Sequence, residues 1–161
     1  MSDLRVGIGY DIHRLVKGRE LRLGGVRLDY TKGLLGYSDG DVLLHAICDA
    51  LLGASGLGDI GGHFPDTDPA YKGIASIELL RHVVKLLHES GFEVVNIDAN
   101  VITETPKIGA HISDMKEVIG AATGIPAERI NVKGRTNEGL GPVGRGEAIA
   151  AQAVTIVKQR A

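Results

Sequence analysis

Three residues in the first part of the chain have side chains of the kinds that bind divalent metal ions. Asp11 and His13 are two positions apart in the stretch Val6-Gly7-Ile8-Gly9-Tyr10-Asp11-Ile12-His13, and His45 follows further along. Side chains alternate faces along a β-strand, so positions 11 and 13 project to the same side. One carboxylate and two imidazoles suit Zn²⁺, and three protein ligands leave a coordination position open for substrate. The spacing alone leaves a second interpretation open, a hydrogen-bonded Asp–His pair at a strand end.

His45 lies in a run of strong helix formers from Val42 to Ala54. The polar exceptions around this apolar run are Asp41, His45 and Asp49, spaced four residues apart, which predicts that they share one stripe of the helix. A solvated face is the alternative, but such faces usually carry Lys, Glu and Arg. We interpret the stripe as functional. In this interpretation His45 is a metal ligand, and Asp41 or Asp49 orients the imidazoles.

Two glycine-rich stretches are dense in hydrogen-bonding side chains. Residues 56–69 form a long connection, in which Asp59 is flanked by glycine and suited either to a ligand hydroxyl or to an Asx turn. Residues 134–147 combine backbone amides with side chains suited to phosphate oxygens and to a hard cation such as Mg²⁺, namely Arg135, Thr136, Arg145 and Glu138. This second stretch is not a Walker A loop, because the Gly-Lys-Ser/Thr ending is missing.

The composition bounds the class of protein. The 161 residues predict one domain spanning 1–161, and 43% hydrophobic and 24% charged residues are ordinary for a globular protein. A net charge of -2 without a Lys/Arg cluster gives no electrostatic basis for nucleic-acid binding. The single cysteine, Cys48, excludes an intrachain disulfide and is expected to be a buried thiol. No apolar stretch reaches membrane-spanning length and Met1 leads into charge, so we expect a cytoplasmic protein without membrane contact.

Hydrophobic periodicity and turn residues predict the elements that position these groups. The first helix is expected to be capped by Ser38 or Asp39, and the second by Ser76. A third helix is expected to start at Pro106, which places Lys107 at its N-terminal end and indicates an anionic partner. The predicted strands are 4–13, 92–103, 129–133 and 148–157, the predicted helices are 42–54, 76–91 and 106–122, and a hairpin is predicted over 20–28 with its turn at Gly24-Gly25.

Over nearly its whole length the chain resembles the 2-C-methyl-D-erythritol 2,4-cyclodiphosphate synthase family of the non-mevalonate isoprenoid pathway. Each matching motif is weak alone, but together they stand in the family's order. The motifs are Asp11-Ile12-His13, Gly33-Leu34-Leu35, Ser38-Asp39-Gly40-Asp41 with His45, Gly58-Asp59-Ile60-Gly61, Phe64-Pro65-Asp66-Thr67-Asp68-Pro69, Pro106-Lys107, Asn131-Val132-Lys133 and Gly144-Arg145-Gly146-Glu147.

The resemblance implies an α+β fold, a ferredoxin-like two-layer sandwich of a mixed β-sheet with helices on one face, assembled as a homotrimer. An active site is implied at each subunit interface. Zn²⁺, one per subunit, would be held by Asp11, His13 and His45 and completed by a substrate phosphate oxygen. Mg²⁺ or Mn²⁺, arriving with the substrate, would be held by Glu138.

The implied reaction is that of a phosphorus–oxygen lyase. The 2-phosphate of 4-diphosphocytidyl-2-C-methyl-D-erythritol 2-phosphate attacks the β-phosphorus and expels CMP, which closes the cyclic diphosphate. Such an intramolecular transfer between anions depends more on positioning and charge neutralisation than on a protein base. This agrees with the motifs, which include metal ligands and phosphate cradles but no Ser–His or Cys–His nucleophile.

The resemblance also assigns substrate contacts. Asp59 would hold the methylerythritol hydroxyls, residues 64–68 would line that pocket and 103–109 would hold the cytidine. Thr136 would support the transition state, and Arg145 would lie near the threefold axis. The full set comprises Asp11, Ile12, His13, Tyr37, Ser38, Asp59, Ile60, Gly61, Phe64, Pro65, Asp66, Thr67, Asp68, Thr103, Glu104, Thr105, Pro106, Lys107, Ile108, Gly109, Arg135, Thr136, Asn137, Glu138, Pro142 and Arg145.

Three residues depart from the family pattern. Tyr37 occupies the position where a histidine commonly helps to stabilise the transition state; tyrosine carries no positive charge at neutral pH but still donates a hydrogen bond, so we expect altered yet retained activity. Arg135 replaces a small hydroxyl residue and adds charge for phosphate. Pro142 replaces a frequent aromatic residue near the central cavity, which argues against prenyl-diphosphate binding there.

Two other functions are compatible with parts of the sequence. A zinc-dependent phosphohydrolase using metal-bound water would share the metal ligands but release a free monoester. A non-enzymatic trimeric regulatory module would need neither the Asp-x-His motif nor the polar helix stripe, and it predicts a protein without stoichiometric zinc.

Overall fold

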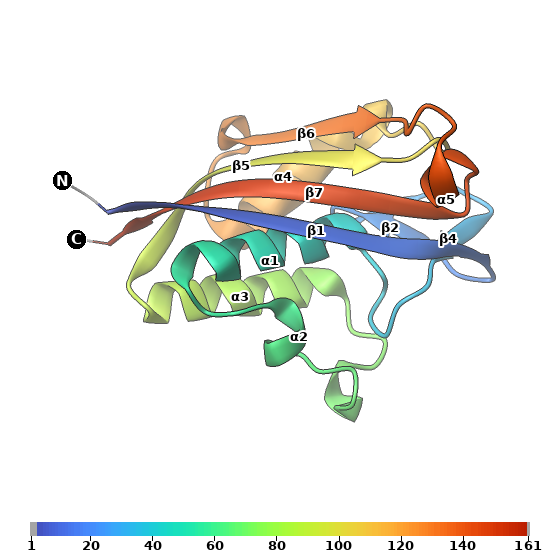
Figure 1. Cartoon of the computed structure of the whole chain (residues 1–161). Coiled ribbons are helices and arrows are strands. Elements are labelled where there is room, and N and C mark those ends of the chain that lie inside the picture. The colour runs from blue at the N-terminus through green and yellow to red at the C-terminus, as the bar shows by residue number, and fades with distance from the viewer. Residues whose placement is uncertain (1–2, 161) are drawn as a thin grey trace.

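The main layer of the molecule is a mixed five-stranded β-sheet (Figure 1), seen in a computed structural model that describes residues 3–160. The strands stand in the order β4-β1-β7-β5-β6, and all neighbours are antiparallel except β5 and β6. A separate hairpin, β2 and β3, turns at Gly24-Gly25 as predicted. The bounds are β1 Leu4–Lys17, β2 Leu21–Leu23, β3 Val26–Leu28, β4 Lys32–Leu34, β5 Phe92–Ile102, β6 Ile130–Arg135 and β7 Ala148–Gln159.

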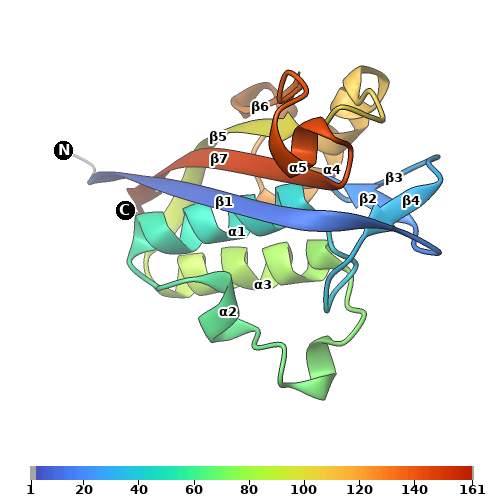
Figure 2. The same ribbon diagram turned by 45° about the vertical axis from the view of Figure 1, so that its right-hand side comes forward.

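The three long helices cover one face of this sheet (Figures 1 and 2), which gives the predicted two-layer α+β arrangement. Helix α1, Val42–Ser55, lies against β1 and β7 and is itself covered by α3, Ser76–Glu89, so nearly all of its residues are buried. Helix α4, Ile112–Thr123, packs on α3 and β6. Shorter pieces are α2, Ile60–His63, α5, Gly141–Gly144, and 3₁₀ turns at Pro69–Tyr71, Gly109–His111 and Ala127–Arg129.

The order of the elements differs from the ferredoxin-like order that the resemblance implied. A ferredoxin-like chain runs β-α-β-β-α-β. Here β1 is followed by α1 and α3, then β5, α4, β6 and β7. Helix α4 carries the chain between the parallel neighbours β5 and β6, because parallel strands need such a crossover. The predicted strands and helices are therefore confirmed as elements, but the ferredoxin-like label is wrong.

Several predicted boundaries are also wrong. Asp41, not Ser38 or Asp39, caps α1, and α3 has Ala75 at its N-cap without a side-chain bond. Helix α4 begins at Ile112 rather than Pro106, so Lys107 lies in the loop before it and not at a helix N-terminus. The long connection predicted over 56–69 contains the short helix α2.

Gly7 and Gly9 bring α1 unusually close to β1. A Cβ atom on Gly7 would lie 1.9 Å from Ala50 O, and one on Gly9 would lie 1.9 Å from Ala46 O. This close backbone approach is made to the helix that carries His45, on the side of β1 that also carries Asp11 and His13. The glycines set the separation between the strand and the helix.

We predict that Gly9→Ala lowers the free energy of unfolding by about 3 kcal/mol, because the added methyl group forces α1 away from β1. Urea unfolding followed by circular dichroism measures the change. Gly53→Ala is the matched control: a Cβ at this α1 position meets no atom within 4 Å, so it is expected to stabilise slightly. Equal stability of the two variants would contradict the close packing of α1 on β1.

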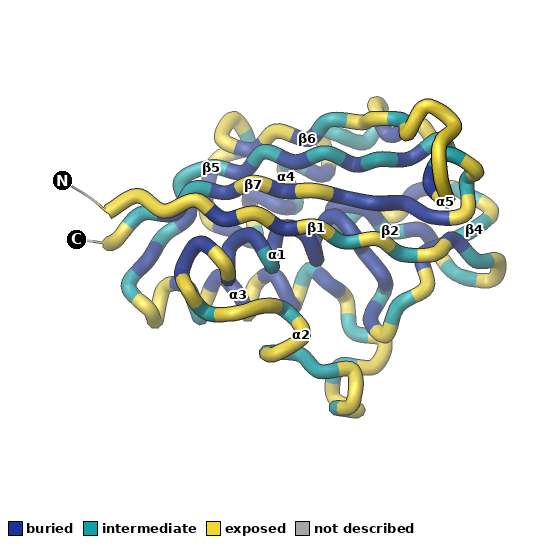
Figure 3. The backbone as a smooth tube through the Cα atoms, in the orientation of Figure 1, coloured by how far each residue is buried: buried dark blue, intermediate teal, exposed yellow. Residues whose placement is uncertain are grey.

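The other face of the sheet carries a row of exposed apolar side chains. Along β1 the tube alternates between exposed and more buried residues (Figure 3). Every second residue of β1 points to this other face, and Val154 of β7 stands opposite Ile8. The exposed fractions are 60% for Leu4, 68% for Val6, 64% for Ile8, 57% for Tyr10, 43% for Ile12 and 41% for Val154. Contiguous apolar surface of this kind marks an interaction site. Within residues 3–160, no helix has the length and apolarity that crossing a membrane requires.

Candidate metal centre and substrate cavity

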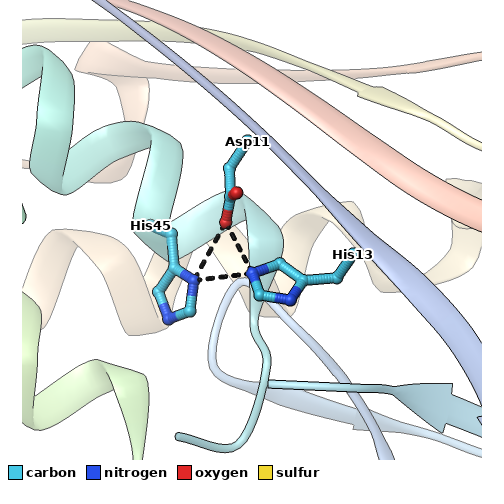
Figure 4. A group of neighbouring side chains, drawn as sticks. All are labelled: Asp11, His13 and His45. Atoms are coloured by element: carbon cyan, nitrogen blue, oxygen red, sulfur yellow. Dashed lines mark hydrogen bonds and ion pairs between the residues drawn. The ribbon is translucent and has the colours of Figure 1, made fainter. Parts of the chain in front are cut away.

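Asp11, His13 and His45 form one compact cluster (Figure 4). Asp11 Oδ2 lies 2.8 Å from His13 Nε2 and 3.0 Å from His45 Nδ1, and the two ring nitrogens are 3.3 Å apart. The first two residues come from the helix-facing side of β1, and His45 comes from the first turn of α1. The structure thus brings together the three residues that the sequence proposed as metal ligands.

The outer nitrogen of each imidazole is engaged away from the cluster. His13 Nδ1 donates to Leu35 O at 2.5 Å, so that Nε2, on the side of Asp11, is the nitrogen that can offer a lone pair to a bound cation. His45 Nε2 lies 2.9 Å from Ser76 Oγ and 3.1 Å from Ser38 Oγ. A carboxylate and two imidazoles held in this way present lone pairs to one point, so the donor set fits a divalent cation such as Zn²⁺.

Mutual interactions shift the pKa values within the cluster. Burial is the largest influence on Asp11 and favours its neutral form, but hydrogen bonds from His13 and His45 and their charges outweigh it, and the pKa of Asp11 falls well below its usual range. Burial likewise opposes charge on His13, yet Asp11 and the Leu35 carbonyl together raise the pKa of His13. The site therefore favours an ionised carboxylate with positive charge beside it.

Neither acidic residue proposed to orient the imidazoles does so. Asp41 is fully buried and accepts from the backbone N–H groups of Gly24, Gly25 and Leu44, so it caps α1 and holds the β2–β3 turn. Burial raises its pKa. Asp49 accepts from Ile60 N at 2.8 Å and holds α2 against α1, and burial raises its pKa too. The stripe is thus mainly structural, with His45 as its functional member.

A cavity of about 240 Å³ opens beside the cluster. His13 and His45 form part of its wall, with the loop before α1 on one side and the segment around α2 on the other. Tyr37 lies in this wall, and its hydroxyl donates to Asp68 O at 3.1 Å. The lining residues are His13, Tyr37, Ser38, His45, Ile60, Gly61, Phe64, Asp66, Tyr71, Ile74 and Leu79.

The segment 59–68 surrounds the outer part of this cavity. Asp59 is exposed and caps α2 through Gly62 N, which is the turn-forming role that its glycine neighbours left open. Phe64 stacks edge-on against Tyr71 and His82, which ties the segment to α3. Pro65, Thr67 and Asp68 belong to the same loop but do not line the cavity, whereas Ile60, Gly61, Phe64 and Asp66 do.

A second cavity, of about 360 Å³, lies at the carboxyl ends of β5 and β6. Among the described residues none lines both cavities. Most of the residues predicted to bind cytidine and phosphate meet in the second one rather than beside the metal cluster. Its lining residues are Thr103, Pro106, Lys107, Ile108, Gly109, Ile112, Gly134, Arg135 and Thr136.

The loop that follows β6 is held by two acidic residues, Glu104 from the segment after β5 and Glu138 from the loop itself. Glu104 accepts from Asn137 N at 2.8 Å and from Gly139 N at 3.3 Å. Thr136 Oγ1 donates to Glu138 Oε1 at 2.9 Å. The residue predicted to support the transition state therefore contacts the residue predicted to hold the Mg²⁺ or Mn²⁺ ion. Glu138 has a positive φ of 52°, an uncommon backbone conformation for a residue other than glycine. Such conformations often occur at functional sites.

A family model described as the YgbB family matches residues 4–158. The chain belongs to the YgbB family. A curated relative named 2-C-methyl-D-erythritol 2,4-cyclodiphosphate synthase, from Desulfosudis oleivorans, is 58% identical over 154 residues, covering 96% of this chain and 92% of that protein. A relative with the same name from Geotalea daltonii is 57% identical over 157 residues, covering 98% and 92%. The family resemblance read from the motifs is confirmed.

Solved structures of similar proteins share this fold. The bifunctional IspDF of Campylobacter jejuni has a TM-score of 0.95 and 41% identity, over 99% of this chain and 43% of that longer chain. IspF of Plasmodium falciparum, solved as a CDP complex, has a TM-score of 0.86 and 34% identity, over 100% of this chain and 99% of its own.

Two residues beside the metal ligands escaped the sequence interpretation. Ser76 is fully buried and touches His45, and its hydroxyl donates to Asp39. Both residues were interpreted only as helix caps, because serine and aspartate before a run of helix formers are typical of N-caps. The sequence signal that would distinguish them is weak, because Ser76 lies one residue after the N-cap of α3 and Asp39 lies two residues before Asp41, the N-cap of α1.

Proposed function

We propose that this YgbB-family chain is a single catalytic domain that converts 4-diphosphocytidyl-2-C-methyl-D-erythritol 2-phosphate into 2-C-methyl-D-erythritol 2,4-cyclodiphosphate and CMP. The observation that carries the proposal is the Asp11–His13–His45 cluster in the wall of a cavity, in a chain 58% identical to a synthase of that name. The substrate's own 2-phosphate forms the new bond to the β-phosphorus, and the bond from that phosphorus to the CMP oxygen breaks.

Asp11, His13 and His45 would hold Zn²⁺, and Glu138 would hold Mg²⁺ or Mn²⁺ beside the diphosphate. These cations supply charge neutralisation for the transferring phosphoryl group. The protein's own groups then position the substrate. Thr136 would turn its hydroxyl from Glu138 to a phosphate oxygen once the cation holds Glu138, and the aromatic ring of Phe64 lines the cavity beside the metal cluster.

We assign the second cavity to the cytidine end of the substrate. Its wall combines apolar surface from Ile108 and Ile112, suited to a base, with the cationic Lys107 and Arg135, suited to phosphate. The structure of a relative solved with CDP supports a cytidine nucleotide as ligand. Lys107 serves this role from a loop and does not depend on a helix dipole.

We further propose a homotrimer in which each active site lies between two subunits. Two observations support it. The apolar row on β1 and Val154 is surface that a neighbouring copy would cover. The metal cluster and the cytidine cavity are separate within one chain, so a substrate spanning both needs a cavity from a second copy. A head-to-tail contact repeated around a threefold axis closes such a ring. Arg145, which pairs with Glu147 at the start of β7, is assigned to the region near the axis.

Incubation of the protein with the cytidyl substrate and Mg²⁺, followed by phosphorus NMR, tests the function. The expected products are CMP and a cyclic diphosphate in equal amounts. Release of a free phosphate monoester would instead indicate a zinc-dependent phosphohydrolase. Absence of turnover together with absence of bound zinc would indicate a non-enzymatic module.

Tyr37 allows a separate prediction, because its hydroxyl donates to the backbone carbonyl of Asp68 and its side chain lines the cavity. Tyr37→His is expected to keep or raise kcat, since an imidazole can carry positive charge toward the phosphates at neutral pH. Tyr37→Phe has neither charge nor hydroxyl and is the matched control, with a kcat below both. Steady-state kinetics at saturating substrate measure all three. Loss of turnover in Tyr37→His would mean that the phenol has a specific role.

A further inference from the structure

The outer nitrogen of His45 contacts a small buried network of hydroxyl groups. Ser76 Oγ lies 2.9 Å from His45 Nε2 and donates to Asp39 Oδ1 at 2.5 Å. Ser38 Oγ lies 3.1 Å from the same ring nitrogen and 3.3 Å from Ser76 Oγ, and it accepts from Gly40 N. Ser76 has no exposed surface, so water does not compete for its hydroxyl group.

When a cation occupies the cluster, the network has one consistent arrangement of protons. The ionised Asp39 carboxylate only accepts, so the Ser76 hydroxyl must give its proton to it. Ser76 Oγ then offers His45 only lone pairs, and His45 Nε2 must be the ring nitrogen that carries hydrogen. Ser38 completes the set by donating to Ser76. His45 Nδ1 then offers its lone pair to the cation, on the side of the ring that faces Asp11 and His13.

Asp39 is itself held firmly. Its carboxylate accepts from the backbone N–H groups of Asp41 at 3.1 Å and Ser76 at 3.1 Å, and its own N–H donates to Ile74 O. These bonds join the loop before α1 to the first residue of α3. The acceptor for Ser76 is therefore positioned by backbone on both sides, and the imidazole cannot rotate without breaking the network.

We infer that Asp39 and Ser76 are positioning residues of the metal centre, which hold His45 in the Nε2–H tautomer and aim Nδ1 at a divalent cation. This inference rests on the proposed metal site and adds to it two residues that act through His45. Carboxylates that orient a ligating imidazole usually contact it directly. Here the Ser76 hydroxyl lies between the Asp39 carboxylate and the His45 ring.

Zinc affinity of the full chain, measured by competition with a chromophoric chelator, tests the inference. Ser76→Ala is expected to raise the Kd for Zn²⁺ by about 10- to 100-fold. Ser55→Ala is the matched control, since Ser55 is also a buried serine but donates within α1 to Leu51 O. The control is expected to bind Zn²⁺ as the wild type does, and Ser76→Thr, which restores a hydroxyl, is expected to bind more tightly than Ser76→Ala.

Nitrogen-15 NMR of the zinc-free protein reads the tautomer directly. The wild type and Ser55→Ala are expected to show His45 protonated at Nε2, and Ser76→Ala a mixture of tautomers. Asp39→Asn is expected to weaken zinc binding much less in the Ser76→Ala background than in the wild type, because Asp39 acts through Ser76. Equal losses in both backgrounds would remove Asp39 from the network.

The outcomes separate this inference from the proposed function. Wild-type affinity in Ser76→Ala, with normal zinc binding by the wild type, overturns the positioning role alone. Weakening in Ser55→Ala equal to that in Ser76→Ala overturns it as well, because the effect would then be one of general stability. A wild-type protein that binds no zinc overturns both the inference and the metal site on which it rests.

Discussion

Replacing His45 by alanine is expected to abolish stoichiometric zinc binding and to lower kcat by about 10³-fold or more. His45 supplies one of three donors that converge on a single point, and two donors from one strand hold a cation far less tightly. A bound cation that neutralises phosphate charge contributes several kcal/mol to the rate, and each 1.4 kcal/mol is about tenfold. Metal content of the purified protein and steady-state turnover are the two measurements.

The oligomer is expected to persist in His45→Ala, because His45 lies on the helix side of the sheet, away from the exposed apolar row. His88→Ala is the matched control: this histidine lies exposed near the end of α3, outside the cluster, and its loss should leave both zinc and turnover unchanged. Full zinc occupancy in His45→Ala would remove His45 from the set of ligands, whatever happened to turnover.

The metal cluster could be predicted from the sequence because local rules determine its parts. Alternation along β1 places Asp11 and His13 on one side, and strong helix formers predict the helix that carries His45. Gly7 and Gly9 in the same strand let another backbone come close, as glycines in strands generally do. The sequence did not reveal that α1 was the approaching element, because that depends on packing across the sheet.

The surroundings of the cluster were harder to predict because short polar side chains have several local uses. Asp41 satisfies the helical spacing of the stripe, yet it precedes the first helical residue, so its carboxylate turns back to cap α1. Ser76 satisfies the capping pattern, yet it is the first helical residue, and its hydroxyl points to His45. A shift of one position along the chain decides between these roles, and helix ends cannot be located that finely from sequence.

The loop around Lys107 shows a different limit. Pro106 is typical of a first helical position, but Thr103 donates to Thr105 O and bends the chain into a turn, and α4 starts only at Ile112. Thr103 and residues 106–109 of the predicted segment still meet Arg135 and Thr136 in one cavity. The predicted helix start at Pro106 was therefore wrong, but these residues still come together in one cavity. They do so because the two segments follow the neighbouring strands β5 and β6.

Replacing Ile8 by glutamate is expected to dissociate the proposed trimer and to lower turnover by about 10²-fold or more at nanomolar protein concentration. Ile8 is 64% exposed at the middle of the apolar row, opposite Val154. A carboxylate buried there without a partner costs several kcal/mol at each subunit contact. Turnover should fall with the oligomer, since the metal cluster and the cytidine cavity of one chain do not meet. Sedimentation equilibrium and turnover over a range of protein concentrations test both effects.

Ala121→Glu is the matched control, because it places the same side chain on an exposed position of α4, on the opposite side of the sheet. It is expected to sediment and turn over as the wild type does. The metal cluster of Ile8→Glu should still bind zinc, since Ile8 points away from α1 while Asp11, His13 and His45 all lie on the helix side. If the Ile8→Glu protein keeps its zinc but loses turnover when it dissociates, the rest of each active site must come from a neighbouring copy. An unchanged oligomer would instead mean that the apolar row of β1 is not the subunit contact.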